Sequence, residues 1–507
     1  MFDDVSSTDL QSALDSIPAG STGLRPSQPK ITDPSRSPQT QGQVWAQHRL
    51  AATPSRWMEN SHMIRIHRKG RQLLVGTGIL LLGLPTTLRT QDNLPYTIYS
   101  TFDQVLKGNG RYPLLTRVSD PGTEEHRNYT GFFFYQCLQF DATGRYLLGM
   151  KVAFQNRVVE PTDRGDVGYF DLKEGYKWTK IGETTAWNWQ QGARLQWRPK
   201  SDEIVWNDRS DDAKKYVCRV YDIRTGKKRI LPRPIYELSP DGSTALTHDF
   251  ERMKHRGTDY VGIEDLYKNQ HAPSETGIWK MNMDTGRAEL IITLEKMAAI
   301  AYPKERPSSG CLYFFREGWN PSATRFIAFV KDPDSGLFKA FSIAADGSDV
   351  RYLYDNPSHH SWLDDTFVMD FGSHTPPGGA SPRTGYFLFK DDGTGQTTEF
   401  LWPTEFDGHG SYVPGPGGDW ILSDTYSIDG LQHLFMFHRP TKLFIPLAKL
   451  RSTAESGLHR VDLHPRFSRD GRLVSIDATH EGLGRQMYIL DISHIVDNPP
   501  RRRGSVP

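Results

Sequence analysis

Short apolar runs bounded by turn-forming residues recur between residues 110 and 495. Runs of this length between Gly, Pro, Asn and Asp are typical of β-strands, and long apolar stripes with helical spacing are rare in this chain. Residues 146–150 (YLLGM) and 420–424 (WILSD) are examples, and each follows a turn rich in Gly with Asp or Pro. The pattern predicts an all-β domain with little helix.

One unit of this pattern occurs seven times. Each unit has an apolar, mostly aromatic residue that ends a first strand, then a tight turn, and then further strands separated by short turns. Four antiparallel strands in a repeat of about 40–50 residues are typical of a propeller blade. The sequence therefore predicts a seven-bladed β-propeller of four-stranded antiparallel blades. The residues that end the first strands are Phe140, Trp197, Leu238, Trp319, Trp362, Tyr412 and Phe467.

The last unit ends after its third strand, near residue 492, and lacks a fourth strand of its own. Residues 112–118 (YPLLTRV) are apolar enough to supply it, which would close the ring and cover two sheet edges. A longer interval at roughly 250–275 is charged and contains His and Tyr, so we expect a loop over one face of the disc. The propeller is predicted to span 110–495, followed by a disordered tail at 496–507.

The composition agrees with a β-rich chain, with 12 Trp, 21 Tyr, 25 Phe, 45 Gly and 33 Pro among 507 residues. The 61 Lys and Arg nearly balance the 60 Asp and Glu, so no overall charge attracts nucleic acid, and none is expected as a partner. The three cysteines have neither metal-site spacing nor the spacing of a disulfide framework. They are Cys137, Cys218 and Cys311.

Residues 1–62 are rich in Ser, Pro, Thr and Gln without an apolar period, which is typical of a disordered extension. Residues 63–90 then place basic residues before an apolar run and a polar flank, the order of a secretory signal or a membrane anchor. The apolar run is short for a spanning helix, and a buried strand or helix is the alternative. We predict export to the periplasm or beyond, with 72–86 as the anchoring segment and Met63 as an alternative start.

An alignment of the seven units compares the residue three positions before each residue that ends a first strand. First strands surround the central channel of a propeller, so side chains at their starts converge on its axis. Five of these seven residues are arginine or histidine, and three histidines fall in successive units. This coincidence favours one shared site over three separate structural histidines. The seven residues are Cys137, Arg194, Ile235, Arg316, His359, His409 and His464.

Two kinds of ligand fit these side chains. Three imidazoles beside a carboxylate suit a divalent metal, with His359, His409, His464 and Asp462 as the predicted ligands. Without a metal, the same histidines together with Arg194 and Arg316 suit a carboxylate, a sulfate or a phosphate. Further predicted site residues are Tyr236 and His360 as catalytic groups, and Gln190, Gln191, Glu317, Tyr412 and His459 as ligand-binding groups.

Two segments carry a resemblance to a known family. The turn at 239–242 (SPDG) and the segment at 464–471 (HPRFSRDG) resemble TolB-type propeller repeats, and within that superfamily those of oligogalacturonate lyase. The resemblance implies a manganese ion bound by the histidine of a His-Pro-x-Phe segment, here His464. It also implies that another histidine and an arginine assist proton abstraction beside a uronate carboxylate. Asp462 and His459 fall near the family's other ligands, but their residue types differ.

Two functions follow as hypotheses. In the first, the protein is a lyase that performs β-elimination on uronic-acid-containing oligosaccharides. An arginine or a metal would neutralise the carboxylate, and a histidine or Tyr236 would remove the C5 proton. In the second, it is a non-catalytic TolB-like propeller that binds a protein or glycan partner. The clustering of cationic residues around one opening favours the enzyme and an anionic sugar, or another small anion, as its ligand.

Overall fold

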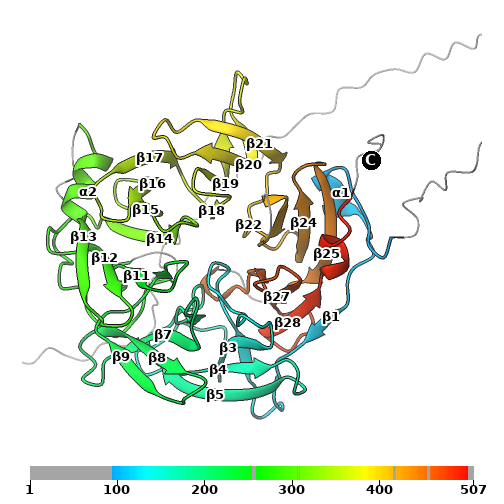
Figure 1. Ribbon diagram of the computed structural model, residues 1–507, viewed down its shortest axis with the longest axis horizontal. Coiled ribbons are helices and arrows are strands. Elements are labelled where there is room, and N and C mark those ends of the chain that lie inside the picture. The colour runs from blue at the N-terminus through cyan, green and yellow to red at the C-terminus, as the bar shows by residue number, and fades with distance from the viewer. Residues whose placement is uncertain are drawn as a thin grey trace, which may run out of the picture. The chain divides into compact units, whose positions relative to one another are not determined.

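The computed structural model describes residues 94–500 except 254–257, 305–306, 308, 415–417 and 454–456. Seven sheets, each of four antiparallel strands, form a ring around a central channel (Figure 1). Within a sheet the strands are neighbours in chain order, apart from one strand in the last sheet. The predicted seven-bladed β-propeller is therefore confirmed.

The first four blades contain the strands from β2 to β17. Blades 1 and 2 comprise β2 (Tyr129–Gly131), β3 (Tyr146–Val152), β4 (Gly165–Asp171), β5 (Lys177–Thr184), β6 (Gln196–Trp197), β7 (Glu203–Arg209), β8 (Tyr216–Asp222) and β9 (Lys228–Leu231). Blades 3 and 4 comprise β10 (Glu237–Leu238), β11 (Thr244–Thr247), β12 (Gly277–Asn282), β13 (Ala288–Thr293), β14 (Tyr313–Trp319), β15 (Arg325–Asp332), β16 (Leu337–Ala344) and β17 (Val350–Asp355).

The last three blades contain the remaining strands. Blades 5 and 6 comprise β18 (Ser361–Trp362), β19 (Phe367–His374), β20 (Arg383–Lys390), β21 (Thr397–Pro403), β22 (Ser411–Tyr412), β23 (Trp420–Asp424), β24 (Leu431–His438) and β25 (Leu443–Arg451). Blade 7 comprises β26 (Arg466–Phe467), β27 (Leu473–Ala478), β28 (Gln486–Asp491) and, from the other end of the domain, β1 (Leu115–Arg117).

The ring is closed by β1, as predicted for residues 112–118. This strand pairs antiparallel with β28, with Leu115 opposite Leu490 and Arg117 opposite Tyr488. Immediately after it, the N–H of Val118 donates to the carbonyl of Met487 at 2.9 Å. Blade 7 therefore combines strands from both ends of the propeller, and neither β28 nor β1 is left without a partner.

The burial of the strands explains the apolar runs in the sequence. In the second strand of blade 4, residues 326–330 are fully buried, because neighbouring blades pack on both faces of a sheet. In the outermost strand β9, exposed residues alternate with more buried ones, since one side of that strand faces solvent. Middle strands therefore appear in the sequence as continuous apolar runs, and some outer strands as alternating ones.

The ordered structure extends beyond the predicted limits of 110 and 495. Helix α1 (Phe102–Lys107) packs on blade 6, and Tyr99 forms an isolated bridge with Phe444. At the other end, helix α3 (Ser493–Val496) is followed by Asn498, whose carbonyl accepts a hydrogen bond from Tyr96 Oη at 2.7 Å. The tail predicted from 496 is thus part of the fold up to Asn498, because these segments cover the core of blades 6 and 7.

Two further segments are additions to the blades. Helix α2 (Leu294–Ala301) follows β13, and Thr293 caps it by accepting a hydrogen bond from the N–H of Lys296 at 3.0 Å. The predicted insertion between β11 and β12 is fixed by the buried Arg252, which donates to the carbonyls of Leu312 and His271, each at 2.8 Å. The insertion is therefore anchored to the rest of the propeller by buried hydrogen bonds.

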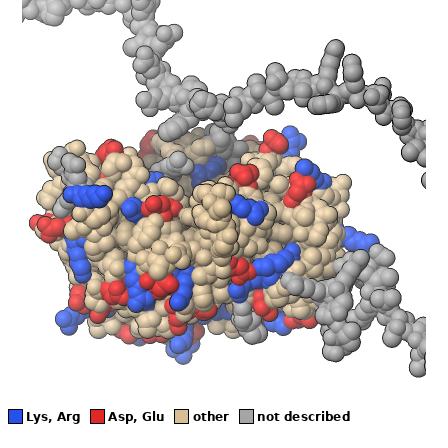
Figure 2. Space-filling model, turned by 90° about the horizontal axis from the view of Figure 1, so that it is seen from above, with Lys and Arg blue, Asp and Glu red and all other residues tan. Residues whose placement is uncertain are grey.

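The predictions for 1–62, for 63–90 and for the anchor at 72–86 lie outside the described residues. Within the part of the chain that the structure describes, we find no helix long and apolar enough to span a membrane. On the surface seen in Figure 2, basic and acidic side chains are intermixed, in agreement with the balanced charge of the chain.

Candidate functional site

A cavity of about 850 Å³ lies at one end of the central channel. Segments from all seven blades line it, so it lies on the propeller axis. Its lining is rich in titratable and cationic side chains. From the predicted site it includes Gln190, Gln191, Arg316, His359, His409, Asp462 and His464, and from the rest of the chain Phe134, Thr258, Lys331, Ser358, Asp407, Tyr426 and Arg460.

Carboxylates of second strands position the histidine segments. In blade 5, Asp370 of β19 accepts the backbone N–H of His359 at 2.7 Å. In blade 6, Asp424 of β23 accepts the N–H of His409 at 2.6 Å and, from blade 7, the N–H of His464 at 3.2 Å. The innermost strands begin only after these residues. The carboxylates therefore satisfy backbone groups that the sheet leaves unpaired.

The repeated position, which precedes the first strand in most blades and lies within β14 in blade 4, has an unusual backbone conformation in three blades. Arg194, Arg316 and His464 have φ values of 52°, 55° and 43°. Such a left-handed conformation costs a non-glycine residue about 1–3 kcal/mol, and it persists where the surrounding structure fixes it. At Arg316 it coincides with a bulge in β14 between Phe315 and Gly318. The backbone thus turns at these positions instead of continuing as regular strand.

His409 is held in a defined orientation by Asp424. Its Nδ1 lies 2.9 Å and 3.1 Å from the two carboxylate oxygens of Asp424. An ionised carboxylate only accepts hydrogen bonds, so Nδ1 is the donor and Nε2 keeps a free lone pair. A carboxylate behind a histidine in this way fixes the tautomer and increases the basicity of a metal-binding nitrogen.

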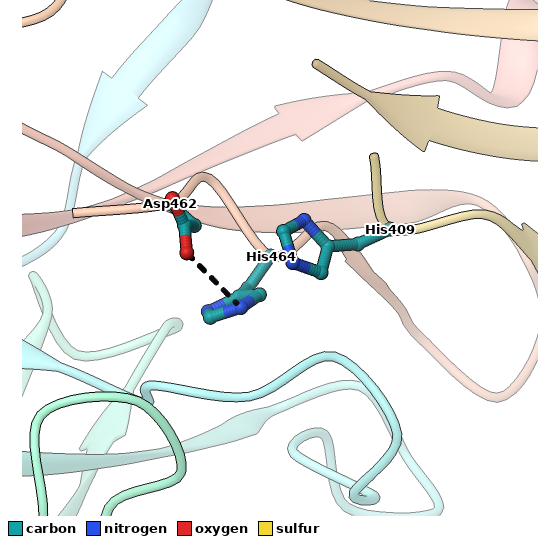
Figure 3. Close-up of side chains that lie close together, drawn as sticks. All are labelled: His409, Asp462 and His464. Atoms are coloured by element: carbon teal, nitrogen blue, oxygen red, sulfur yellow. Dashed lines mark ion pairs between the residues drawn. The ribbon is translucent and has the colours of Figure 1, made fainter. Parts of the chain in front are cut away.

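His409, Asp462 and His464 form a compact group that fits a metal ion. One ligand atom from each residue lies within 4.8 Å of the other two, and all three side chains are buried. His464 Nε2 is 3.9 Å from Asp462 Oδ2, and the rings of His409 and His464 are 4.1 Å apart (Figure 3). Two imidazoles and a carboxylate are suitable donors for a divalent metal.

His359 lies beside this group and has its own set of contacts. Its ring is 4.3 Å from that of His409, and its Nδ1 is 2.8 Å from Ser358 Oγ. Ser358 Oγ in turn donates to Asp407, so a hydrogen-bonded chain leads from Nδ1 to a carboxylate. His359 Nε2 is buried, and among the residues that the structure describes it has no hydrogen-bond partner. This arrangement leaves Nε2 as an acceptor.

The charges of the site are strongly affected by burial. Burial and then the Arg316 charge lower the pKa of His359 well below its usual range, so this imidazole is neutral. Burial and then His409 have the same effect on the pKa of His464. Burial raises the pKa of Asp407 and of Asp462, which disfavours their ionised forms unless a cation is nearby.

Cationic side chains flank the imidazoles. Arg316 lines the cavity and donates through Nη1 to the carbonyl of Ser358. Its Nε is buried and has no hydrogen-bond partner within the described part of the chain. Arg460 lies on the side of blade 7, with Nε 2.9 Å from Asp462 Oδ2. Together with Lys331, these groups make the cavity suitable for an anion.

Three predicted site residues lie in a layer behind the cavity wall. The fully buried Arg194 donates to the carbonyl of Tyr236 at 2.9 Å and pairs with Glu237 at 3.1 Å. The hydroxyl of Tyr236 accepts a hydrogen bond from Gln191 Nε2 at 3.0 Å, so Gln191 separates it from the cavity. Glu317 is bound to His248 Nδ1 at 2.8 Å. The structure therefore does not place Arg194, Tyr236 or Glu317 on the cavity surface.

The structure also separates His360 and Tyr412 from the histidine cluster. Both line a second cavity, of about 310 Å³, formed by residues at the other ends of the innermost strands. His359 and His360 are consecutive in extended chain, where successive side chains point to opposite sides. His459 is half-buried in the short 3-10 helix η3 (Gly457–His459) and does not line the first cavity.

Several site residues were not predicted from the sequence. Asp370 lies in the middle of the second strand of blade 5, and Asp424 is the last residue of the second strand of blade 6. The second strands of blades 7 and 2 likewise contain a polar residue, Asp477 and Asn207. A polar residue repeated in otherwise apolar second strands is a signal that an alignment of the units contains. Ser358 and Tyr426 carry no such signal.

Solved structures resemble this chain at low sequence identity. An oligogalacturonate lyase in complex with manganese is 14% identical, with a TM-score of 0.52, over 78% of this chain and 96% of that chain. An oligogalacturonate lyase from Vibrio parahaemolyticus is 13% identical over 79% and 97%, with a TM-score of 0.47. TolB from Acinetobacter baumannii is 15% identical over 60% and 64%, with a TM-score of 0.33.

No family model and no curated protein matches the sequence. The predicted resemblance is confirmed at the level of the fold, because the lyase structure with manganese matches this seven-bladed propeller over 96% of its own length, with a TM-score of 0.52. The chain is a seven-bladed β-propeller similar in fold to oligogalacturonate lyase.

Proposed function

We propose that this protein is a lyase that cleaves uronic-acid-containing oligosaccharides by β-elimination in the axial cavity. The observation that carries the proposal is that Arg316 and His359 line the same cavity, with Arg316 bonded to the carbonyl of Ser358, the residue before His359. The guanidinium has a buried Nε, the neighbouring imidazole is neutral, and neither Arg316 Nε nor His359 Nε2 has a hydrogen-bond partner among the described residues. An anion-binding group next to a base is what removal of a proton beside a carboxylate requires.

The protein's own side chains account for the proton transfers. Arg316 pairs with the uronate carboxylate, and His359 Nε2 accepts the proton from C5. Ser358 is bonded to His359 Nδ1 and donates in turn to Asp407, and this chain stabilises the imidazolium that forms. The C4–O bond breaks as the C4–C5 double bond forms. Tyr426 donates its proton to the departing oxygen, since burial raises its pKa and keeps the hydroxyl protonated.

His409, Asp462 and His464 are the residues that would bind a divalent metal such as manganese. A bound metal would supply a second positive charge that polarises the carboxylate and acidifies the C5 proton. Asp424 orients His409 for this purpose from the side opposite its Nε2. In this assignment His359 acts as the base and is not a ligand.

The test is incubation of the purified protein, with and without added manganese, with a panel of polyuronates and their short oligomers. The expected result is ultraviolet absorbance from the unsaturated product on at least one substrate. Absence of product across the panel, in protein shown by metal analysis to contain its metal, contradicts the proposal.

A second function is supported by the contact between Arg460 and Asp462. Arg460 Nε occupies one side of the carboxylate that a metal would use. In a metal-free protein, Arg316, Arg460 and neutral imidazoles form an anion-binding site without catalysis, as in a propeller that binds a glycan or protein partner. Calorimetric binding of galacturonate to metal-free protein, with no turnover in the metal-loaded form, favours this function.

We also propose that the protein is exported, on the order of basic, apolar and polar residues at 63–90. The test is a fusion of residues 63–100 to a reporter that is active only outside the cytoplasm. A fusion that remains in the cytoplasm contradicts export by this segment.

A further inference from the structure

Four aromatic residues in a row, at 132–135, follow β2 in the sequence and lead the chain across the central channel before β3 begins. All four are buried. The N–H groups of Phe132 and Phe133 both donate to the carboxylate of Asp477 in blade 7, at 3.0 Å and 2.9 Å. Phe133 has a φ of 77°, so the chain turns at this point, and the two residues after it reach the axis.

The last two residues of this run, Phe134 and Tyr135, separate the two axial cavities, and we call this pair the axial plug. Phe134 lines the cavity that contains the histidines, and Tyr135 lines the cavity at the other ends of the innermost strands. Tyr135 is fixed by a hydrogen bond from its Oη to the carbonyl of His360 at 3.1 Å. The rings of Phe134 and Tyr135 are 5.0 Å apart, so the two side chains pack as one unit.

The axial plug contacts every imidazole of the site. The Tyr135 ring lies 5.6 Å from that of His359 and 5.6 Å from that of His409. The Phe134 ring lies 5.7 Å from that of His464. These are contact distances for packed aromatic rings. Carboxylates of the second strands bind the backbone N–H groups of the histidines, and the axial plug packs against the imidazole rings.

Arg316 is also in contact with the plug, because its guanidinium carbon lies 5.8 Å from the centre of the Phe134 ring. Residues from blades 4, 5, 6 and 7 thus share one pair of aromatic neighbours from blade 1. Because the plug contacts site side chains from four blades at once, it fixes the positions of these side chains relative to one another. Contacts within one blade do not have this effect.

We propose that Phe134 and Tyr135 are the positioning residues of the site, and that their rings set the orientation of His409 and His464 for metal binding and of His359 as the base. The inference rests on the metal centre proposed above. The ring of Tyr135 is the part that acts, and its hydroxyl serves to anchor the ring. Loss of the ring should therefore be harmful where loss of the hydroxyl is not.

The experiment compares purified full-length wild type with Tyr135→Phe and Tyr135→Leu. Cobalt binding is followed by its visible absorption spectrum, which reports the geometry of the ligands. In the same proteins, the rate of carbethoxylation of His359 and His409 is mapped by mass spectrometry, with the exposed His126 as internal reference. Phe170→Leu is the matched control, because it removes an equally buried ring from blade 1 without touching the site.

We expect Tyr135→Leu to weaken cobalt binding about tenfold or more, as loss of groups that orient metal ligands does. Carbethoxylation of His359 and His409 should become faster, while Tyr135→Phe retains the wild-type values. The proposal is overturned if Tyr135→Leu behaves as wild type, or if Phe170→Leu produces the same changes. If wild type binds no cobalt, the metal centre fails, and the carbethoxylation rates alone decide on the plug.

Discussion

Arg316 is the residue on which the proposed chemistry depends most directly, because it supplies a fixed positive charge beside His359. We expect Arg316→Gln to lower kcat/KM on an active polyuronate by about 10- to 100-fold, the loss of a hydrogen bond to a charged group. Arg316→Lys should be intermediate, since it keeps the charge but loses the planar fork of donors. Initial rates of product absorbance measure both.

The control for this pair is Arg383→Gln, which removes an exposed arginine at the start of β20. It should leave kcat/KM unchanged. An Arg316→Gln protein that is folded and as active as wild type would exclude Arg316 from carboxylate binding.

Asp424 offers a second test at the scale of single residues. We expect Asp424→Asn to weaken manganese binding by about 10- to 100-fold, because His409 Nδ1 loses its carboxylate partner. Electron paramagnetic resonance of free manganese during a titration measures the affinity. Asp370→Asn is the matched control, since Asp370 supports the backbone of His359 in the same way but contacts no imidazole of the metal group. Equal losses in both variants would contradict the assignment.

The difference between predicted and observed site residues has a physical reason at this scale. His359, His409 and His464 were identified because they share one position in the repeat, and a repeated backbone places them alike. Arg194 shares that position, but its side chain turns toward Tyr236 and Glu237, which are specific to its own neighbourhood. Repeat position predicts where a backbone lies, and neighbouring side chains decide where a long side chain points.

Among the elements, β1 links the two ends of the propeller, because it comes from the N-terminal side and completes blade 7. We expect Val118→Pro to lower the free energy of unfolding by about 1–3 kcal/mol, since the Met487 carbonyl loses its donor. Deletion of residues 110–120 should be more harmful, because it exposes the edge of β28. Thermal denaturation measures both, and unchanged melting temperatures would contradict ring closure by this strand.

The short innermost strands explain how the elements position the site. A two-residue strand such as β18 or β22 pairs with its neighbour only after the histidine has been passed. The backbone before such a strand donates its N–H groups to carboxylates and can take left-handed φ values, which a regular strand does not permit. The ends of the innermost strands were predictable from the turn motif, whereas the support of the preceding segments depends on contacts within and between blades.

For the whole molecule, buried histidines predict a loss of stability in acid. Burial lowers the pKa of His433 from its ordinary value to about 4 and that of His360 to about 3. Below the ordinary value the unfolded chain binds these protons and the folded chain does not, so the free energy of unfolding falls as the pH decreases. The window for His433 lies between about pH 6.5 and about pH 4.

We expect His433→Gln to reduce this acid sensitivity by up to one proton, or about 1.4 kcal/mol per pH unit within that window. Urea denaturation at a series of pH values measures the slope. The same substitution at the exposed His126 controls for loss of an imidazole as such. A slope equal to that of wild type in His433→Gln would show that His433 is not buried as a neutral group.

The sequence by itself determined the all-β class, the seven units, the closing strand and the convergence of three histidines on the axis. These features depend on local propensity and on repetition, since the turn and the apolar runs recur in each unit and repeated units take equivalent places around one axis. Only the tertiary structure decided which side chains share a cavity. It placed His360 and Tyr412 at the other end of the channel, and it brought Asp424, Ser358 and the Phe134–Tyr135 pair to the histidines. Those juxtapositions join residues from different blades, or from opposite ends of the chain, so no local pattern encodes them.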